Sequence, residues 1–296
     1  MVELLLASVD ANGTDLRDSR NFSAVPDAAK LIKEAEQAFA AHKLDDAFEL
    51  YQRALKIDPR SYSAALFSGD VFFVRDEFGK AIEWFSKAVG IDSNRELAFR
   101  YWGDALMKLG RTHEARQRYI EAVIAEPYNR LPREMLTRHA TASKVSLRPP
   151  EVALPRLEVA LKGEKISVDF DPSHGPLVLA YALGRSQWLK EEREKFFGKD
   201  TVPRHSLAEE CHGLRTFLKV AAELAEKEPA AVKTFEATIA ALKELDATGL
   251  LEAYVLFDRA DMDLALDYAP YRIEHRETLI RYVNKIWFRN ASGQEP

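Results

Sequence analysis

The stretch LDDAFELYQRALKIDP at residues 44–59 returns twice in altered form, as FGKAIEWFSKAVGIDS at 78–93 and as THEARQRYIEAVIAEP at 112–127. The copies are offset by 34 residues, and their small and aromatic positions agree in register. These positions are Ala47, Ala81 and Ala115, then Tyr51, Phe85 and Tyr119, then Ala54, Ala88 and Ala122. The spacing i, i+4 and i+7 places the three positions of each copy on one helical face. Each copy therefore predicts a helix that packs an aromatic ring between two small residues.

A second amphipathic segment precedes each copy. Its buried face is expected to carry the small residues Ala35, Gly69 and Gly103, set among apolar neighbours. A glycine inside a helix costs about 1 kcal/mol relative to alanine, so close approach of the paired helix is the expected reason for both glycines. A single unit of 34 residues cannot bury its apolar face alone. The period therefore predicts a stack of helix pairs.

Residues 28–129 resemble three repeats of the tetratricopeptide repeat family, and 131–140 are expected to form the helix that caps them. The chain departs from the family pattern at Glu34 and Ser68, where a large apolar residue is common, and at Ser93, where proline is common. The resemblance implies a mainly α fold, in which a helix-turn-helix superhelix is followed by a helical C-terminal domain. It also implies that the repeats hold a protein partner.

The resemblance further implies a concave binding surface, lined by the first helix of each repeat. An aromatic and aliphatic stripe with charged neighbours maps to this surface. The residues predicted to bind a peptide there are Phe39, Phe67, Asp70, Phe73, Arg100, Tyr101, Asp104 and Met107. One subgroup of the family grips a C-terminal carboxylate with lysine, arginine and asparagine, whereas acids stand here at Glu36, Asp70 and Asp104. Three carboxylates repel a fourth, so binding of a chaperone tail is not expected.

Two interpretations of the stripe stay open. An apolar patch rimmed by charge is typical of an interaction surface, and it suits the apolar face of an amphipathic helix with basic flanks. Alternatively, the C-terminal half of the same chain fills the groove, because an interface and an intrachain contact rest on the same physics.

The composition excludes several classes of function. A chain of 296 residues is long enough for two domains, and a net charge of -5 with a pI near 5.9 argues against a nucleic-acid partner. The single cysteine, Cys211, excludes an internal disulfide. No apolar window predicts a membrane span, and the run Leu4 to Val9 lacks the preceding basic residue of a secretory signal. A cytoplasmic location is expected, with a leader removed before residue 1 left open.

The sequence changes character after the repeats. We predict an N-terminal tail at 1–27, three repeats with a capping helix at 28–140, a proline-rich linker at 141–156 and a helical domain at 157–296. Alternating apolar residues at 157–170 predict a β-hairpin that turns at Gly163. This half resembles uncharacterised regions of bacterial proteins that carry the same repeats.

Helical signals dominate from residue 175 onward. A helix through Leu177, Leu183 and Trp188 is expected to run to Phe197, where Gly198 stops it. Ser206 followed by Glu209 is a capping box that opens the next helix. The polar turn at 171–175 is expected to cap the helix that follows it.

Two polar groupings around residue 210 qualify as candidate sites. His205, Glu209 and His212 are spaced to present three ligands to zinc on one helix, but His205 precedes the helix, and a solvated helix start is the default interpretation. Cys211 and His212 are adjacent, so they point about 100° apart and cannot act as nucleophile and base. A buried, inert cysteine is expected.

A third grouping, Asp261, Asp263 and Asp267, imitates the start of a calcium loop. Leu266 and Arg272 stand where such a loop needs glycine and glutamate, so calcium binding is not expected. The acids are expected to face solvent or to form ion pairs. The partners predicted for them are Arg259, Arg272 and Arg276.

The sequence contains no phosphate-binding loop, dinucleotide fingerprint or paired-cysteine metal motif. We therefore predict no catalytic residue, metal ligand or cofactor, and a non-enzymatic scaffold that binds a protein or peptide in the groove. Two alternatives stay open. One is a metal-dependent or thiol enzyme in the second half, targeted by the repeats, and the other is a homo-oligomer in which the groove takes a helix from another copy.

Overall fold

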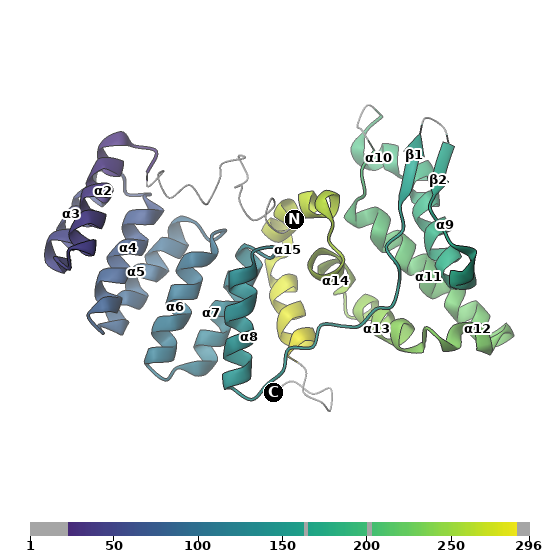
Figure 1. Ribbon diagram of the computed structural model, residues 1–296. Coiled ribbons are helices and arrows are strands. Elements are labelled where there is room, and N and C mark those ends of the chain that lie inside the picture. Colours follow the sequence, from purple (N-terminus) through teal and green to yellow (C-terminus); the bar gives the residue numbers. More distant parts are fainter. Residues whose placement is uncertain (1–22, 163–164, 200–202, 289–296) are drawn as a thin grey trace. The chain divides into compact units, whose positions relative to one another are not determined.

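The computed structural model describes residues 23–162, 165–199 and 203–288 of the chain (Figure 1). Most of the predicted N-terminal tail and the predicted turn at Gly163 lie outside these residues. The described chain forms two compact units, which divide between Leu147 and Arg148. We call residues 23–147 the repeat unit and residues 148–288 the C-terminal unit.

The repeat unit consists of helix pairs followed by one further helix, as the period predicts (Figure 1). Within each pair, the second helix packs against the first and also against the first helix of the next pair. Its helices are α2 (Pro26–Ala40), α3 (Leu44–Ile57), α4 (Tyr62–Val74), α5 (Phe78–Ile91), α6 (Glu96–Lys108), α7 (Thr112–Ala125) and α8 (Arg130–Ala142).

The turn inside each pair uses a left-handed backbone residue at the same place in the repeat. His42, Asp76 and Gly110 have φ values of 60°, 58° and 74°, and they are spaced by the repeat period. Lys144, one period after Gly110, has φ 58°. The chain therefore leaves α8 as it leaves the first helix of each repeat. Helix α8 corresponds to the first helix of a fourth repeat, and the next element among the described residues is a strand, β1 (Val159–Lys162).

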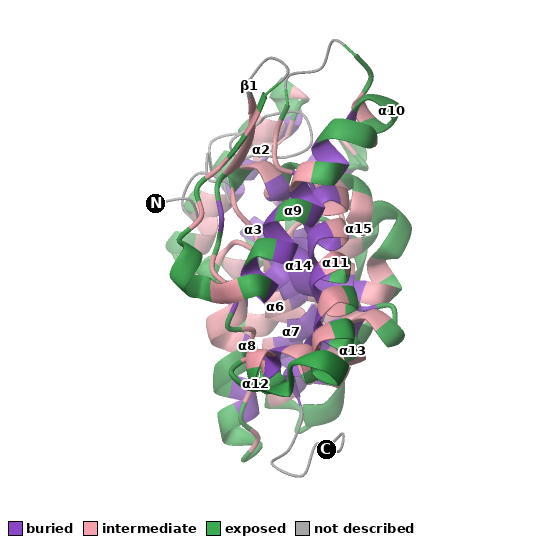
Figure 2. Ribbon diagram, turned by 90° about the vertical axis from the view of Figure 1, so that its right-hand side faces the viewer, coloured by how far each residue is buried: buried purple, intermediate pink, exposed green. Residues whose placement is uncertain are grey.

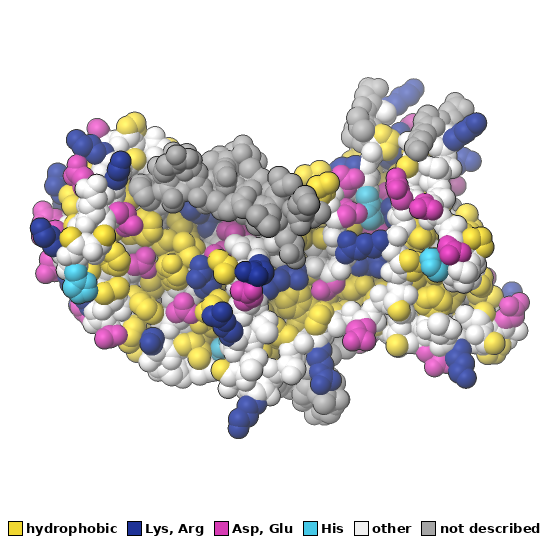
Figure 3. Space-filling view, in the orientation of Figure 1, with side chains coloured by type: hydrophobic (Ala, Val, Ile, Leu, Met, Phe, Trp, Pro, Cys, Tyr) yellow, Lys and Arg dark blue, Asp and Glu magenta, His cyan; other side chains and the backbone are white. Residues whose placement is uncertain are grey.

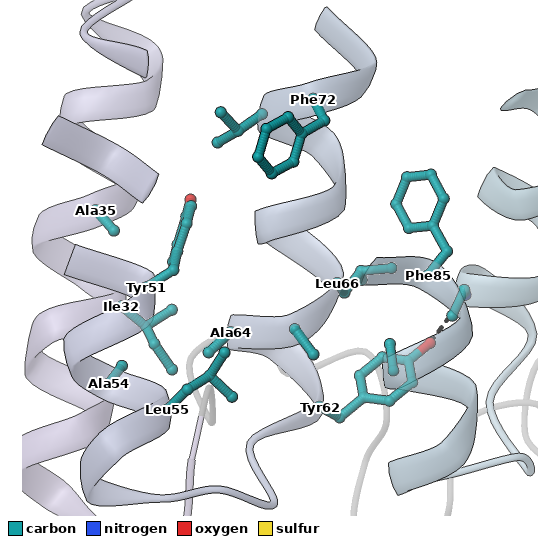
Figure 4. Close-up of a cluster of buried hydrophobic side chains, with 14 of the residues drawn as sticks. Ile32, Ala35, Tyr51, Ala54, Leu55, Tyr62, Ala64, Leu66, Phe72 and Phe85 are labelled. Atoms are coloured by element: carbon teal, nitrogen blue, oxygen red, sulfur yellow. Dashed lines mark hydrogen bonds between the residues drawn. The ribbon is translucent and has the colours of Figure 1, made fainter. Parts of the chain in front are cut away.

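The core of the repeat unit is built around the predicted aromatic wedges (Figure 4). Tyr51 and Phe85 are fully buried among the small residues on either side of them. A Cβ atom added to Gly69 would lie 2.4 Å from the Phe85 ring, and one added to Gly103 would lie 2.6 Å from the Tyr119 ring. The two glycines are therefore required by helix packing, as the sequence predicts.

Substitution of Gly69 by alanine is expected to lower the free energy of unfolding of the repeat unit by about 1–3 kcal/mol, because the buried Phe85 ring has no free volume into which to move. Gly90 in α5 is the matched control, since an added Cβ there meets nothing within 4 Å. Gly90→Ala is expected to gain up to about 1 kcal/mol. Urea unfolding of the two variants measures both effects, and equal stability of Gly69→Ala and wild type would contradict the packing explanation.

The C-terminal unit combines one hairpin with a helical bundle. The strands β1 (Val159–Lys162) and β2 (Lys165–Val168) are antiparallel, with Val159 opposite Val168, so the predicted hairpin forms but is shorter than 157–170. The remaining elements are η1 (Pro172–His174), α9 (Gly175–Glu191), α10 (Arg193–Phe197), α11 (Leu207–Lys227), α12 (Pro229–Lys233), α13 (Glu236–Ala247), α14 (Leu251–Asp258), α15 (Met262–Tyr282) and η2 (Val283–Trp287).

Helices α9, α11 and α14 carry much of the buried surface of this unit (Figure 2). Gly184 and Gly213 allow α9 and α11 to approach closely, since a Cβ added to either would lie 2.5 Å from a side chain of the other helix. One detail of the predicted first helix is wrong, because the helix breaks at Glu192. Leu183 lies within α9 as predicted, and it is 56% exposed because the face that packs on α11 is centred on Tyr181 and Trp188.

Part of the proline-rich segment before the hairpin packs against the C-terminal unit. Leu154 and Leu157 are buried there, and the Ala153 amide donates to Thr238 Oγ1 at 3.0 Å. The Leu154 carbonyl accepts from Arg259 at 3.3 Å, and the Leu157 carbonyl accepts from Arg185 at 2.8 Å. Residues 153–157 are therefore an integral strap of this unit.

Candidate binding groove and a buried charge cluster

A pocket of about 190 Å³ opens on the repeat unit, lined by the first helices of its three pairs. Helix α2 contributes one side chain, α4 contributes three and α6 contributes two. The lining residues are Phe39, Asp70, Phe73, Val74, Tyr101 and Asp104. Figure 3 shows hydrophobic side chains beside acidic ones on the surface that the repeat helices form. The pocket therefore combines apolar walls with carboxylates.

The aromatic walls are held from behind by further rings. The Phe73 ring meets Phe78 edge to face with centroids 5.4 Å apart, and Tyr101 meets Phe85 in the same way at 5.8 Å. Both wall residues are half-buried, so one side of each ring is anchored and the other is accessible. Rings fixed in this manner lose little conformational entropy when a partner binds.

The acids at equivalent places of the first and third repeats are bound by tyrosines of their own repeats. The Tyr51 hydroxyl donates to Glu36, and the Tyr119 hydroxyl donates to Asp104 Oδ1 at 2.7 Å. Burial raises the pKa of Glu36 and of Asp104, and the hydrogen bond from tyrosine partly offsets the increase in each.

Asp70 occupies the same place in the second repeat, but Phe85 stands where the other repeats have tyrosine. No hydrogen bond to the Asp70 carboxylate forms within the described part of the chain. Burial raises its pKa to about 7, the charge of Glu36 adds to the increase, and Arg100 opposes it. Asp70 is thus the pocket acid that receives no tyrosine hydroxyl in the described part of the chain.

Arg100 is engaged within its own helix and does not neutralise the pocket. Its guanidinium binds both oxygens of Glu96, at 2.9 and 3.2 Å, and lies over the Tyr101 ring at 5.1 Å. These contacts fix the Tyr101 ring in place.

The predicted groove residues divide into two groups. The lining includes Phe39, Asp70, Phe73, Tyr101 and Asp104, together with Val74. The other predicted residues do not line it: Phe67 packs against Tyr51 with centroids 5.9 Å apart, Arg100 binds Glu96, and Met107 is half-buried elsewhere on α6.

A second grouping of polar side chains, which sequence reasoning missed, lies inside the C-terminal unit. Its centre is Glu210, which is 1% exposed. Glu210 accepts from Arg259 Nε at 2.5 Å, from the Tyr181 hydroxyl at 2.6 Å and from His205 Nε2 at 3.0 Å. Arg185 lies 3.7 Å away. We call these five residues the Glu210 cluster.

Charges in the Glu210 cluster strongly perturb its pKa values. Burial alone would raise the pKa of Glu210, but Arg259, His205 and Arg185 outweigh burial and hold the pKa well below its ordinary value. Burial alone would lower the pKa of His205, but hydrogen bonds to Asp261 and Glu210 raise it to about 9. The cluster therefore holds an ionised carboxylate and a protonated imidazole at neutral pH.

The predicted solvated start of α11 is therefore wrong, because Ser206, Glu209 and Glu210 are all buried. Ser206 caps the helix by accepting from the Glu209 amide at 3.2 Å, as predicted. The second half of the predicted capping box does not form, since the Glu209 carboxylate binds Arg185 Nε at 2.8 Å.

The aspartates of the calcium-like stretch pair with partners other than those predicted. Asp261 caps α15 and lies 2.6 Å from His205 Nδ1, whereas Asp267 binds Arg204 and the Leu207 amide. Similarly, the predicted cap of α9 serves η1, where Asp171 accepts from the Ser173 amide at 2.9 Å.

No three His, Cys, Asp or Glu side chains of the described chain are placed to hold a metal ion. Burial raises the pKa of Cys211 well above its ordinary value, so this thiol is neutral.

A second pocket of about 310 Å³ adjoins the Glu210 cluster, between β1 and residues 203–205. The two arginines of its lining are already paired, Arg185 with Glu209 and Arg204 with Asp267.

The fold and the pocket are those of a helical-repeat protein. Three helix pairs stack in sequence order, and a partly apolar pocket lies on their first helices. Residues 32–96 match the family model described as tetratricopeptide repeat. The match covers most of the first two helix pairs, and it supports tetratricopeptide repeats in this part of the chain.

Several solved structures resemble the chain. The first TPR of Spaghetti (RPAP3), bound to the HSP90 peptide SRMEEVD, is 21% identical with a TM-score of 0.38 and covers 42% of this chain and 98% of its own. The Sgt2 TPR domain from Aspergillus fumigatus is 21% identical with a TM-score of 0.39, covering 42% and 84%. MamA protein is 11% identical with a TM-score of 0.35, covering 84% and 94%.

None of the helices in the described ranges combines the length and the hydropathy that crossing a bilayer requires.

Proposed function

We propose that this protein is an interaction scaffold whose repeat unit binds the apolar face of a helical segment of a partner protein. The observation that carries the proposal is the pocket on α2, α4 and α6, whose accessible walls include Phe39 and the anchored rings of Phe73 and Tyr101. Aromatic side chains that are fixed on one side and accessible on the other are enriched at the centres of protein interfaces.

The dimensions of the pocket favour a protein side chain over a free small molecule. Sites that enclose a drug-sized ligand have volumes of roughly 300–1,000 Å³. The pocket here has about 190 Å³ and is continuous with the first-helix surface of three successive repeats. A helical segment that crosses these helices and inserts one or two side chains is the ligand that fits best.

The charges of the pocket argue against an anionic ligand. Glu36, Asp70 and Asp104 stand on the same set of first helices, and Arg100 is committed to Glu96. A peptide ending in an acidic sequence would meet like charge. The proposed partner is therefore neutral or basic along the face that enters the groove.

Site-specific photo-crosslinking tests the proposal. A photoreactive phenylalanine analogue at Val74, which lines the pocket, is expected to cross-link a protein in lysate of the source cells. The same analogue at Ile57 is the control, because Val74 and Ile57 are each 46% exposed and only Val74 lines the pocket. A cross-linked protein of the same mass and yield from both positions, or from neither, would overturn the proposal.

A further inference from the structure

Asp70 differs from its counterparts in the neighbouring repeats. Glu36 and Asp104 each receive a tyrosine hydroxyl from the second helix of their own repeat. Phe85 takes this place behind Asp70, so the ring that packs on Gly69 offers the carboxylate no donor. The second repeat therefore presents a carboxylate to the pocket with its hydrogen-bonding capacity unused within the described residues.

The helices packed around Asp70 offer little to neutralise it. Helix α2 brings the acid Glu36, α3 brings a tyrosine that donates to Glu36, and α5 brings an apolar ring. Helix α6 brings one nearby cation, Arg100, which already binds Glu96 through two hydrogen bonds. The charged groups that act on Asp70 are Glu36 and Arg100, and those that act on Asp104 are Arg100 and Lys108. Asp70 also acts on the neighbouring hydroxyls of Tyr51 and Tyr101. Asp70 therefore has an acid, Glu36, as a neighbour, and its cationic neighbour Arg100 is already bound to Glu96.

The walls suit the stem of a long basic side chain. Phe39, Phe73 and Tyr101 line the pocket together with Asp70 and Asp104. Lysine and arginine bury their methylene stems on apolar surface while they place the cationic head at a polar site, and aromatic faces attract the cation. Apolar walls that end at an unpaired carboxylate match both parts of such a side chain.

We infer that the pocket receives a lysine or arginine side chain of the bound segment, whose cationic head binds Asp70 and whose stem packs between Phe73 and Tyr101. The inference rests on the proposed function and adds a requirement for the partner: a basic residue at the centre of the apolar face that enters the groove. Because a carboxylate without a counter-ion would be costly to bury beneath an apolar partner, the cation also removes the main penalty of closing the groove.

The inference has a consequence for pH. Burial and the charge of Glu36 raise the pKa of Asp70 to about 7 in the free protein, so the acid is partly protonated at neutral pH. A bound cation favours the ionised form, and binding therefore releases a proton below this pKa. Affinity for a basic segment is expected to fall by about tenfold between about pH 8 and about pH 6.

Selection from a phage-displayed library of random helix-forming peptides on the full-length protein tests the inference. Peptides that compete for the groove are recognised because they fail to bind the Phe73→Ala/Tyr101→Ala variant. We expect these peptides to share a lysine or arginine at one position of their apolar face. For such a peptide, Asp70→Asn is expected to weaken binding by about tenfold or more and to abolish the pH dependence, because a charged hydrogen bond is lost.

Glu49→Gln is the matched control, because Glu49 is an exposed acid on α3 that does not line the pocket and its loss changes the net charge equally. Groove-binding peptides without a shared basic residue, or with equal affinity for wild type and Asp70→Asn, would overturn the inference and leave the proposed function standing. Failure to select any peptide that depends on Phe73 and Tyr101 would overturn both.

Discussion

Replacing Glu210 by glutamine is expected to lower the free energy of unfolding of the C-terminal unit by about 3–5 kcal/mol, the usual effect of removing one partner of a buried ion pair. The substitution keeps the size of the side chain but removes the charge that Arg259 meets at 2.5 Å. Arg259 is 7% exposed and Arg185 is 3% exposed, so neither guanidinium can turn to solvent without unfolding its surroundings. The destabilisation arises mainly from Arg259, which loses its carboxylate partner, because Arg185 keeps its contact with Glu209.

Hydrogen exchange of α9 and α11 measures this effect in the C-terminal unit alone, since the repeat unit has separate helices. Glu226→Gln is the control, because Glu226 is an exposed acid on the same helix as Glu210 and surface charges contribute at most about 1 kcal/mol. Arg259→Met combined with Glu210→Gln is expected to be less destabilised than the sum of the two single variants. A loss below about 1 kcal/mol for Glu210→Gln would show that water reaches the cluster.

The Glu210 cluster also determines how the stability of the C-terminal unit depends on pH. Glu210 has a lowered pKa in the fold, so its contribution is present above its ordinary pKa of 4.5 and is lost as the pH falls through the folded value. His205 has a raised pKa, so its contribution is complete below its ordinary pKa of 6.5 and is lost as the pH rises through about 9. The difference between wild type and Glu210→Gln is therefore expected to be largest between these two ordinary values.

The repeat unit was predictable because its determinants are local and periodic. Tyr51, Phe85 and Tyr119 lie sixteen positions after the small residues they pack on, and the pattern returns with each period. The Glu210 cluster has no such signal. His205 and Asp261 are 56 residues apart, and Glu210 and Arg259 are 49 apart, so nothing local distinguishes these charges from a solvated helix end.

The pocket falls between these two cases. The period identifies the positions that face it, but the period alone does not tell which of them meet at one point and which pack elsewhere. Phe67 and Met107 share the expected face with Phe73, yet only Phe73 lines the pocket. The sequence did contain a signal for Asp70. The acids Glu36 and Asp104 are each followed 15 positions later by a tyrosine, whereas Asp70 is followed at that spacing by Phe85. Its meaning becomes visible only with the hydrogen bonds of the other two repeats.

Replacing Phe73 and Tyr101 together by alanine is expected to weaken binding of the protein cross-linked at position 74 by about a hundredfold or more. Central aromatic residues of an interface commonly contribute about 2 kcal/mol or more each, and 1.4 kcal/mol is tenfold in affinity. Both rings line the pocket, and each also packs on a ring behind it, Phe78 or Phe85. Some loss of stability is therefore expected together with the loss of binding, while the helix content is expected to stay intact.

Phe48→Ala/Trp84→Ala separates these two effects. Phe48 and Trp84 also form an edge-to-face pair, with centroids 5.8 Å apart, but they lie on the second helices and do not line the pocket. The control pair is expected to lose stability and to keep its affinity, as measured by calorimetry at a temperature where circular dichroism shows both variants folded. If the control loses affinity as strongly as the pocket variant, binding depends on the stability of the whole repeat unit. The pocket walls around Asp70 are then not the centre of the binding site. If only the pocket variant loses affinity, the binding energy lies where the aromatic rings and the unpaired acid of the second repeat meet.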